Sequence, residues 1–454
     1  MKNFDLIVIG SGSGLDVASG AARNGMEVAV IEKGPIGGTC LNRGCIPSKM
    51  LIHRADLVEK IEKSEKFGIS SEITNIDFSS ITEEVNEEVA RDAKSIENGL
   101  KKSDYHTLYK GEAKFVDERT LEINGEKIKG EKIIVAAGSR PKIPPIEGIN
   151  EVDYITSKEA LKLKELPEHM VIVGGGYIAA ELGHFYGSMG TEVTIIGRSN
   201  SMLSKEDNDI SREFTELFKK KHNVKTGYEV KGVWQREGEI FVKARNKEGE
   251  EIETSGDELL IAAGRKPNTD SLELEKANIE TDEMGFIKTN KYLETTAENV
   301  WALGDIAGNW MFKHSANLEA QYVFINAIRD HKHEIKYENM PHAIFSSPQI
   351  AGVGKTEEEL ENEDKDYLKG TYEYKNTGMG AALKEESGFV KVLVDPENGK
   401  ILGCHILGPD ASQLIHEVLV VMKRGTTQDI MNTVHIHPAL NEVVQRAFNS
   451  LRRP

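Results

Sequence analysis

The chain has 454 residues, of which 39% are hydrophobic and 29% are charged, a composition typical of a globular protein of roughly three domains. Its net charge of -17 argues against nucleic acid as a partner, and no apolar run approaches the ~20 residues that span a bilayer. Three cysteines are too few for a secreted disulfide scaffold, and the N-terminus lacks a signal-peptide cleavage site, so we expect a cytoplasmic protein.

The first predicted unit is a strand, a glycine-rich turn, a helix and a second strand in DLIVIGSGSGLDVASGAARNGMEVAVIEK. Gly10 permits the tight turn, and Gly12 lets the backbone approach a pyrophosphate at the N-terminus of the helix. The usual third glycine would fall at Leu15, so we expect Gly14 to admit the helix in a slightly different way. Glu32 ends the second strand, where a carboxylate can accept hydrogen bonds from ribose hydroxyls. This context predicts dinucleotide binding.

Two cysteines follow in GGTCLNRGCIPSK, where Cys40 and Cys45 lie close to the nucleotide-binding pattern. A zinc site would need two further ligands with suitable spacing, and Cys404 stands alone, so we expect no metal. A structural disulfide is rare in the cytosol, which leaves a redox-active pair. The following residues predict the start of a helix, where the dipole and a cation such as Lys49 stabilise a thiolate.

A second strand, turn, helix and strand occur in HMVIVGGGYIAAELGHFYGSMGTEVTIIGR. Its fingerprint, formed by Gly174, Gly176 and Ala179, is the more regular of the two. Gly197 occupies the acidic position after the second strand, and Arg198 comes next. A carboxylate there would repel a 2′-phosphate, while an arginine can bind one, which favours NADPH over NADH. The alternative is a surface arginine at a strand end.

Each of these units is followed by a strand that runs into Ala-Gly and a proline-bearing turn, in EKIIVAAGSRPKIPPIEG and in DELLIAAGRKPNTD. The chain therefore repeats a dinucleotide-binding architecture, with one copy inserted after the other. From about Lys336 the pattern changes to strands followed by helices without a nucleotide fingerprint. We predict an α/β protein with two Rossmann-like domains and a C-terminal α+β domain.

The phrase HIHPALNE near the C-terminus offers a proton acceptor for thiol chemistry. His437 precedes a proline, and Glu442 lies five residues further on. Imidazole has an unperturbed pKa of ~6.5, suited to exchanging a proton with a thiol. A carboxylate partner would fix its tautomer and raise its basicity. His435 is either a residue of the same kind or a surface histidine.

Together, GGTCLNRGCIPSK, AAGSRP, WALGDIAG and HIHPALNE resemble the FAD-dependent pyridine nucleotide–disulfide oxidoreductases, over nearly the whole chain. That family includes dihydrolipoamide dehydrogenase, glutathione reductase, mycothione reductase and mercuric reductase. The resemblance implies an FAD domain built from residues 1–149 and 271–336 and an inserted NAD(P) domain at 150–270. It also implies an interface domain at 337–454 that makes a homodimer.

The resemblance assigns a role to each residue of the redox centre. Cys40 would be the interchange thiol that attacks the substrate, and Cys45 would face the flavin and form the charge-transfer complex. His437 and Glu442 would be the acid–base dyad, reaching across the dimer to the partner subunit's disulfide.

The resemblance to this family also implies which residues contact the cofactors. Lys49 would lie near flavin N5, paired with Glu181 beside the nicotinamide, and Asp305 would bind the flavin ribitol. The residues expected to contact FAD are Gly10, Gly12, Gly14, Glu32, Lys33, Gly38, Thr39, Lys49, Ala113, Ala137, Gly138, Asp305 and Lys313. Those expected to contact NAD(P) are Gly174, Gly176, Tyr177, Ile178, Ala179, Glu181, Arg198 and Gly264.

The redox motif is most similar to that of dihydrolipoamide dehydrogenase, so we expect this activity first, with lipoyl groups of a 2-oxoacid dehydrogenase complex as one source of the dithiol. Arg43 departs from the family, where Val is common. Leu15, Arg198 and KHSANLEA, in place of an AHKAEEEG-like run, favour a mycothione-type reductase. The first alternative is therefore an NADPH-dependent reductase of a low-molecular-weight thiol disulfide. The second is a non-catalytic flavin-binding scaffold subunit.

Overall fold

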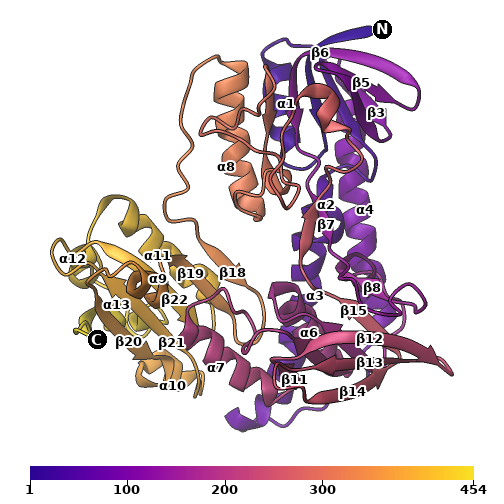
Figure 1. Ribbon diagram of the computed structural model, residues 1–454. Helices are drawn as coiled ribbons and strands as arrows, with labels where there is room; N and C mark the ends of the chain where they lie inside the picture. Colours follow the sequence, from indigo (N-terminus) through magenta and orange to yellow (C-terminus); the bar gives the residue numbers. More distant parts are fainter. The chain divides into compact units, whose positions relative to one another are not determined.

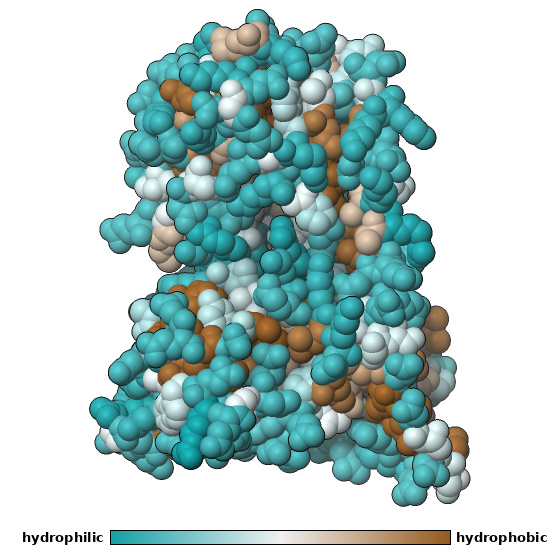
Figure 2. All heavy atoms as spheres, turned by 90° about the vertical axis from the view of Figure 1, so that its right-hand side faces the viewer, coloured by the Kyte–Doolittle hydropathy of each residue, from teal (hydrophilic) through white to brown (hydrophobic).

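The computed structural model describes all 454 residues, and the chain forms two compact units (Figure 1). Unit 1 is made of Met1–Met50, Ser80–Ile143 and Gly264–Lys336, and unit 2 of Leu51–Ser79, Pro144–Ala263 and Tyr337–Pro454. The face seen in Figure 2 is mostly hydrophilic, in keeping with the large net charge. None of the helices combines the length and the apolar character that crossing a membrane requires.

Unit 1 is built on a seven-stranded sheet of β1 (Lys2–Ile9), β2 (Val28–Glu32), β3 (His106–Lys110), β4 (Ala113–Asp117), β5 (Thr120–Ile123), β6 (Glu126–Val135) and β17 (Val300–Ala302). Its order is β3-β2-β1-β6-β5-β4, and β17 also pairs with β6. The strands β3, β2, β1, β6 and β17 run parallel, whereas β4 and β5 extend the sheet as an antiparallel meander. The parallel part therefore brings several strand ends to one edge.

The helices of unit 1 are α1 (Gly14–Arg23), α2 (Gly38–Arg43) and α8 (Lys313–Val323), with the short turns η2 (Leu274–Ala277), η3 (Gly304–Ile306) and the π-helix η4 (Phe324–Ile328). Two longer helices, α3 (Cys45–Glu62) and α4 (Phe78–Lys102), begin in one unit and end in the other. In Figure 1, α1 and α8 lie side by side. Leu6 and Val8 of β1 share an apolar cluster with Val17 and Ala320, whereas Ile7 packs in the cluster on the opposite face.

The central sheet of unit 2 is parallel, with the order β11-β10-β9-β15-β8. The strands of this sheet are β8 (Ile155–Thr156), β9 (His169–Val173), β10 (Glu192–Gly197), β11 (Asn223–Thr226) and β15 (Glu258–Ile261). The helices of this part of the chain are α5 (Ser157–Ala160), α6 (Tyr177–Met189) and α7 (Asn208–Lys219). A three-stranded antiparallel sheet is formed by β12 (Glu229–Arg236), β13 (Glu239–Arg245) and β14 (Glu251–Gly256). The two predicted strand–helix–strand repeats, β1–α1–β2 and β9–α6–β10, are both present.

The C-terminal part of unit 2 is a five-stranded antiparallel sheet of order β18-β19-β22-β21-β20. Its strands are β18 (His342–Ile344), β19 (Ile350–Gly354), β20 (Leu368–Glu373), β21 (Phe389–Val394) and β22 (Ile401–Leu407). Its helices are α9 (Glu357–Asn362), α10 (Gly378–Ala382), α11 (Ala411–Arg424), α12 (Thr427–Asn432) and α13 (Glu442–Asn449). Val392 and Ile406 of the sheet pack in one buried cluster with Val443 and Phe448 of α13. The predicted α+β architecture of the C-terminal part is confirmed.

Candidate active site

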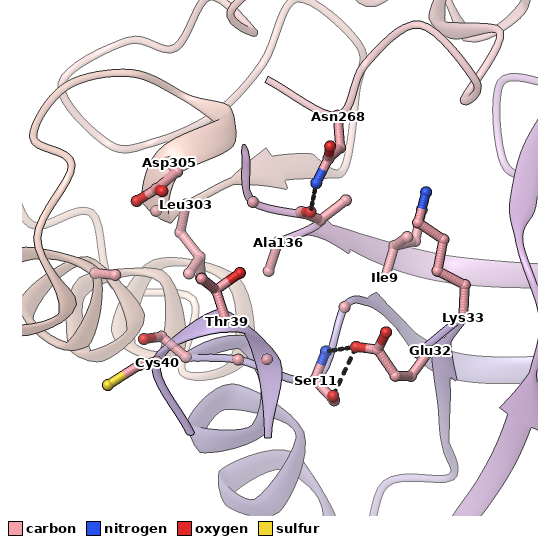
Figure 3. A pocket seen from close by; sticks show the side chains of 18 of the residues that line it. Ile9, Ser11, Glu32, Lys33, Thr39, Cys40, Ala136, Asn268, Leu303 and Asp305 are labelled. Atoms are coloured by element: carbon pink, nitrogen blue, oxygen red, sulfur yellow. Dashed lines mark hydrogen bonds between the residues drawn. The ribbon is translucent and has the colours of Figure 1, made fainter. Parts of the chain in front are cut away.

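A pocket in unit 1 lies at the carboxyl ends of the parallel strands, where open α/β sheets bind ligands. Ile9 and Glu32 are the last residues of β1 and β2, while Ala136 and Leu303 directly follow β6 and β17 (Figure 3). Most of the residues predicted to contact FAD line this pocket, namely Gly10, Gly12, Glu32, Lys33, Gly38, Thr39, Ala113, Ala137, Gly138, Asp305 and Lys313. Gly14 and Lys49 do not belong to the lining.

Gly14 instead packs α1 against the sheet. A Cβ atom at this position would come within 2.8 Å of Val8 Cγ1 and 2.9 Å of Ala136 Cβ. Close packing of helix against strand is the role of the third glycine of the fingerprint. In this chain Gly14 has this role, one position before the usual third glycine, and position 15 can therefore be a leucine.

Gly12 and Gly38 form a backbone cradle at the N-terminus of α1. Gly38 has a φ of +69°, and a Cβ atom on it would lie 2.7 Å from the Cα of Gly12. A side chain at Gly38 would therefore fill the space between the two loops. An open backbone beside a helix N-terminus is suited to binding a phosphate group.

Glu32 is fixed by hydrogen bonds from the surrounding loops. The backbone N–H and the hydroxyl of Ser11 donate to Oε2 at 3.0 and 2.7 Å (Figure 3). The Gly34 N–H donates to Oε1 at 2.7 Å. The Gly37 N–H in turn donates to Ser11 Oγ at 3.0 Å, which ties the fingerprint to the loop before Cys40. A carboxylate has about four acceptor sites, so Glu32 keeps acceptor capacity for a ligand hydroxyl.

Asp305 belongs to a three-residue network that the sequence did not predict. Ser139 Oγ donates to Asp305 Oδ2 at 2.5 Å, and Arg265 donates through Nε to Ser139 Oγ at 2.7 Å and through Nη2 to the Ser139 carbonyl at 2.8 Å. Burial lowers the pKa of Arg265, and the charge of Asp305 opposes this shift. Ser139 and Arg265 lie in the two repeated Ala-Gly phrases, which pair as the short strands β7 (Ser139–Pro141) and β16 (Arg265–Pro267). The repetition of these two phrases was the sequence signal that could have indicated their pairing.

The two cysteines lie at adjoining helices, Cys40 within α2 and Cys45 at the first residue of α3. Asn42, a buried residue between them in the sequence, donates to the carbonyls of Ile36 and Gly38 at 2.9 Å and fixes the short helix. Both cysteines are thiols and half-buried, and both line the pocket. Cys40 and Asp305 lie toward one end of the pocket, and Glu32 lies toward the other (Figure 3).

The Cys40 and Cys45 side chains share a hydrogen bond. This bond raises the pKa of Cys40, and burial and the negative charge of Cys45 raise it further. The charge of Lys313 acts in the opposite direction. Cys45 begins the 18-residue helix α3, whose N-terminus is a position that favours a thiolate. Two sulfurs in hydrogen-bonding contact are placed to form a disulfide on loss of two electrons.

Lys49 and Glu181, predicted as a pair, belong to different units. Lys49 lies one turn after Cys45 on α3, where its Nζ donates to Ser48 Oγ at 3.4 Å. Glu181 lies on α6, and its Oε1 accepts the Phe345 N–H at 3.0 Å. Their pairing stays a prediction.

The predicted NAD(P) residues cluster around the start of α6 in unit 2. Gly174 and Gly176 lie in the turn after β9, followed by half-buried Tyr177 and Ile178 and by fully buried Ala179. Arg198 directly follows β10 and is exposed. Gly264, by contrast, belongs to unit 1.

Tyr177 is held by a buried carboxylate that the sequence did not reveal. Its hydroxyl donates to Glu206 Oε1 at 2.5 Å, and His342 Nε2 lies 2.6 Å from Glu206 Oε2. Burial raises the pKa of Glu206, but the hydrogen bonds from His342 and Tyr177 outweigh it and the net shift is downward. The contact joins residues far apart in the chain, so no local pattern could indicate it.

His437 and Glu442 form a hydrogen-bonded pair at the start of α13. His437 Nδ1 lies 3.0 Å from Glu442 Oε1, and the Ala439 N–H donates to Oε2 at 3.2 Å. The hydrogen bond with His437 lowers the pKa of Glu442, so the carboxylate is charged at neutral pH. The His437 side chain is 73% exposed. With Nδ1–H donating to the carboxylate, Nε2 is left as the proton acceptor.

The neighbouring His435 is placed differently. Its side chain is only 5% exposed, and Nδ1 lies 2.9 Å from the Thr433 carbonyl. Val434 and Ile436, on either side, are 94% and 77% exposed. Of the two histidines, His437 is therefore the one available to a partner or substrate.

Comparisons with known proteins cover nearly the whole chain. The family described as pyridine nucleotide-disulphide oxidoreductase matches residues 4–320, and its dimerisation domain matches residues 340–448. Dihydrolipoyl dehydrogenase of Bacillus subtilis is 36% identical, over 98% of this chain and 95% of that protein. Mycothione reductase of Mycobacterium tuberculosis is 34% identical, over 100% of both. The solved structure of the HOCl-induced flavoprotein disulfide reductase RclA from Escherichia coli has a TM-score of 0.87 and 29% identity, over 98% of this chain and 99% of that one.

Proposed function

Because the chain belongs to the pyridine nucleotide-disulphide oxidoreductases, an FAD-dependent family that uses NAD(P)H, we propose that it acts as a dihydrolipoamide dehydrogenase. The main observation in support of this proposal is the Cys40–Cys45 pair. The two side chains share a hydrogen bond and line the same pocket as the glycines of the first nucleotide-binding fingerprint. The proposed substrate is a small dithiol, including lipoyl groups of a 2-oxoacid dehydrogenase complex.

The residues of the pocket fit FAD. The cradle of Gly12 and Gly38 would accept the pyrophosphate, Glu32 the adenosine ribose, and Asp305 a ribitol hydroxyl. When bound, FAD supplies the two-electron exchange between NAD(P)H and the thiol pair. The remaining chemistry belongs to side chains of this protein.

In the reductive direction, the Cys40 thiolate attacks one sulfur of the substrate disulfide. The substrate S–S bond breaks, a mixed disulfide forms at Cys40, and the first substrate thiolate leaves. Cys45 then attacks the Cys40 sulfur, which releases the second thiolate and forms the Cys40–Cys45 disulfide. His437, oriented by Glu442, would take the proton from Cys40 and give it to the leaving thiolate. Oxidation of a dithiol reverses these steps.

We propose the domain division at 1–149 with 271–336, 150–270 and 337–454, and a cytoplasmic homodimer in which the dyad serves the partner subunit's cysteines. The dimerisation-family match and the exposed Val434 and Ile436 support the dimer. A non-catalytic scaffold is a weaker candidate than an enzyme, because the chain has each of the residues proposed for the exchange, Cys40, Cys45 and His437.

An NADPH-dependent reductase of a low-molecular-weight thiol disulfide is the second candidate. The exposed Arg198 at the end of β10 supports it, because a guanidinium there is free to meet a 2′-phosphate. The similarity to mycothione reductase supports it as well.

Steady-state kinetics of the purified flavoprotein separate these candidates. We expect turnover of dihydrolipoamide with NAD⁺, measured as NADH formation. The same preparation is assayed with NADH and with NADPH against lipoamide, glutathione disulfide and other small disulfides. No turnover of dihydrolipoamide, together with turnover of NADPH and another disulfide, would reject the first candidate and support the second. No turnover of any pair would support the scaffold.

A further inference from the structure

Tyr177, the first residue of α6, lies at the edge of the unit 2 sheet where open parallel sheets bind dinucleotides. It directly follows the turn of Gly174 and Gly176 that leaves the carboxyl end of β9. Gly174 has a φ of +132°, and a Cβ atom on it would lie 2.3 Å from the Ala262 carbonyl oxygen, so the turn packs closely against the loop after β15. Because the N-terminus of such a helix binds the pyrophosphate, the side chain of Tyr177 is placed to contact the same ligand.

The loop that follows β10 contacts this turn on both sides. The Leu203 N–H donates to the Gly175 carbonyl at 2.7 Å, just before the helix begins. Glu206 Oε1, three residues further along the loop, accepts the Tyr177 hydroxyl at 2.5 Å. Leu203 has a φ of +54°, a backbone region that leucine rarely adopts, so the contacts of the folded protein hold the loop in this shape.

The C-terminal sheet of the same unit fixes the Glu206 side chain, which is only 1% exposed. His342 of β18 lies with Nε2 2.6 Å from Glu206 Oε2, and its imidazole stacks on the Tyr177 ring with 6.3 Å between centroids and 18° between planes. A Cβ atom at Gly352, in the neighbouring strand β19, would lie 2.6 Å from His342 Cε1, so the glycine leaves space for the imidazole. Tyr177, Glu206 and His342 therefore form one packed group.

The residue after Glu206 anchors the loop a second time. Asp207 is fully buried, and its Oδ1 accepts from Lys391 Nζ of β21 at 2.8 Å. Its Oδ2 accepts the Glu357 N–H at 3.1 Å. Because a buried ion pair is costly to break, this anchor keeps Glu206 at a fixed position beside Tyr177.

We propose that Glu206 and His342 are positioning residues for the nicotinamide dinucleotide, because together they hold the Tyr177 ring in one orientation at the N-terminus of α6. The inference rests on the proposed function and adds to it two residues from outside the fingerprint. With its hydroxyl bound to Glu206, the ring is ordered before the dinucleotide arrives. Binding then does not have to immobilise it, which favours affinity.

The test is calorimetric titration of the oxidised holoenzyme with NAD⁺ and with NADP⁺, and the variants are compared with the nucleotide that the wild type binds more tightly. Tyr177→Phe keeps the ring and removes the hydroxyl, and should raise the Kd by roughly three- to tenfold, because the ring must then be ordered on binding. Glu206→Met removes the acceptor at similar length and should raise the Kd by a similar factor. His342→Phe keeps a stacked ring, loses the hydrogen bond to Glu206 and should raise the Kd by a smaller factor.

The double variant Tyr177→Phe/Glu206→Met separates positioning from general damage to the fold. If Glu206 acts through the Tyr177 hydroxyl, the double variant should have the Kd of the weaker-binding single variant, whereas independent effects multiply. The KM for the nucleotide should rise in the single variants with kcat nearly unchanged. Glu216→Met removes an exposed glutamate of α7 and should leave the Kd unchanged.

Tyr177→Phe and His342→Phe keep the proposal testable should Glu206→Met fail to fold. Unchanged Kd values in these variants, with wild-type FAD absorbance, would overturn the positioning role, as would effects that multiply in the double variant. These results would leave the proposed function intact. A wild-type holoenzyme that binds neither NAD⁺ nor NADP⁺ would instead overturn the proposed function, and the inference with it.

Discussion

Substitution of Cys40 by serine is expected to reduce dithiol–disulfide turnover by roughly 10³-fold or more while FAD stays bound. The hydroxyl of serine stays protonated at neutral pH and cannot form the mixed disulfide with the substrate. Cys40 is one of many residues that line the pocket, so the cradle of Gly12 and Gly38 is retained. The measurements are kcat with the substrate that the wild type turns over, and FAD content from visible absorbance.

Cys404→Ala is the matched control. Cys404 lies fully buried in β22, in unit 2, and burial raises the pKa of its thiol. It has no place in the proposed exchange, so turnover should persist, with some loss of thermal stability from the small cavity. Undiminished turnover in Cys40→Ser would show that another group attacks the substrate.

Replacement of His437 by glutamine is expected to lower kcat by about 10²- to 10⁴-fold, the usual contribution of general acid–base catalysis. Glutamine can still donate to Glu442, but it cannot exchange a proton with Cys40 or the leaving thiolate. The ionisation of His437 should also disappear from the pH dependence of kcat/KM. Glu442→Gln should have the smaller effect, because it removes only the charged acceptor that orients Nδ1.

His435→Gln distinguishes the two histidines. His435 is buried against the Thr433 carbonyl and lies 3.6 Å from Glu417, so we expect it to affect stability more than kcat. A His435 variant that loses turnover while His437→Gln retains it would reverse the assignment.

The parts of the site that local patterns describe were predictable. The strand–turn–helix–strand repeats, the helix that begins at Cys45, and the architecture after Lys336 each follow from spacing and residue type within short windows. Glu32 at the end of β2 is an example, because the continuous apolar run Val28–Ile31 indicates a buried strand that ends at this carboxylate.

Contacts between distant segments were not predictable. Arg265 reaches Ser139 because β7 and β16 pair, although the two residues are 126 positions apart. Gly14 takes over helix packing because of the shapes of Val8 and Ala136, which no glycine pattern encodes. Lys313 was expected as a cofactor contact, but its hydrogen bond to Ser13 depends on how α8 packs beside α1. Such contacts are decided by tertiary packing.

Electron exchange between the Cys40–Cys45 pair and FAD in this pocket is tested most directly by anaerobic two-electron reduction followed by visible spectroscopy. We expect a long-wavelength charge-transfer absorption in the wild type and its absence in Cys45→Ser. A protein that binds no FAD, or an absorption that persists unchanged in Cys45→Ser, would contradict the placement of these sulfurs against the flavin.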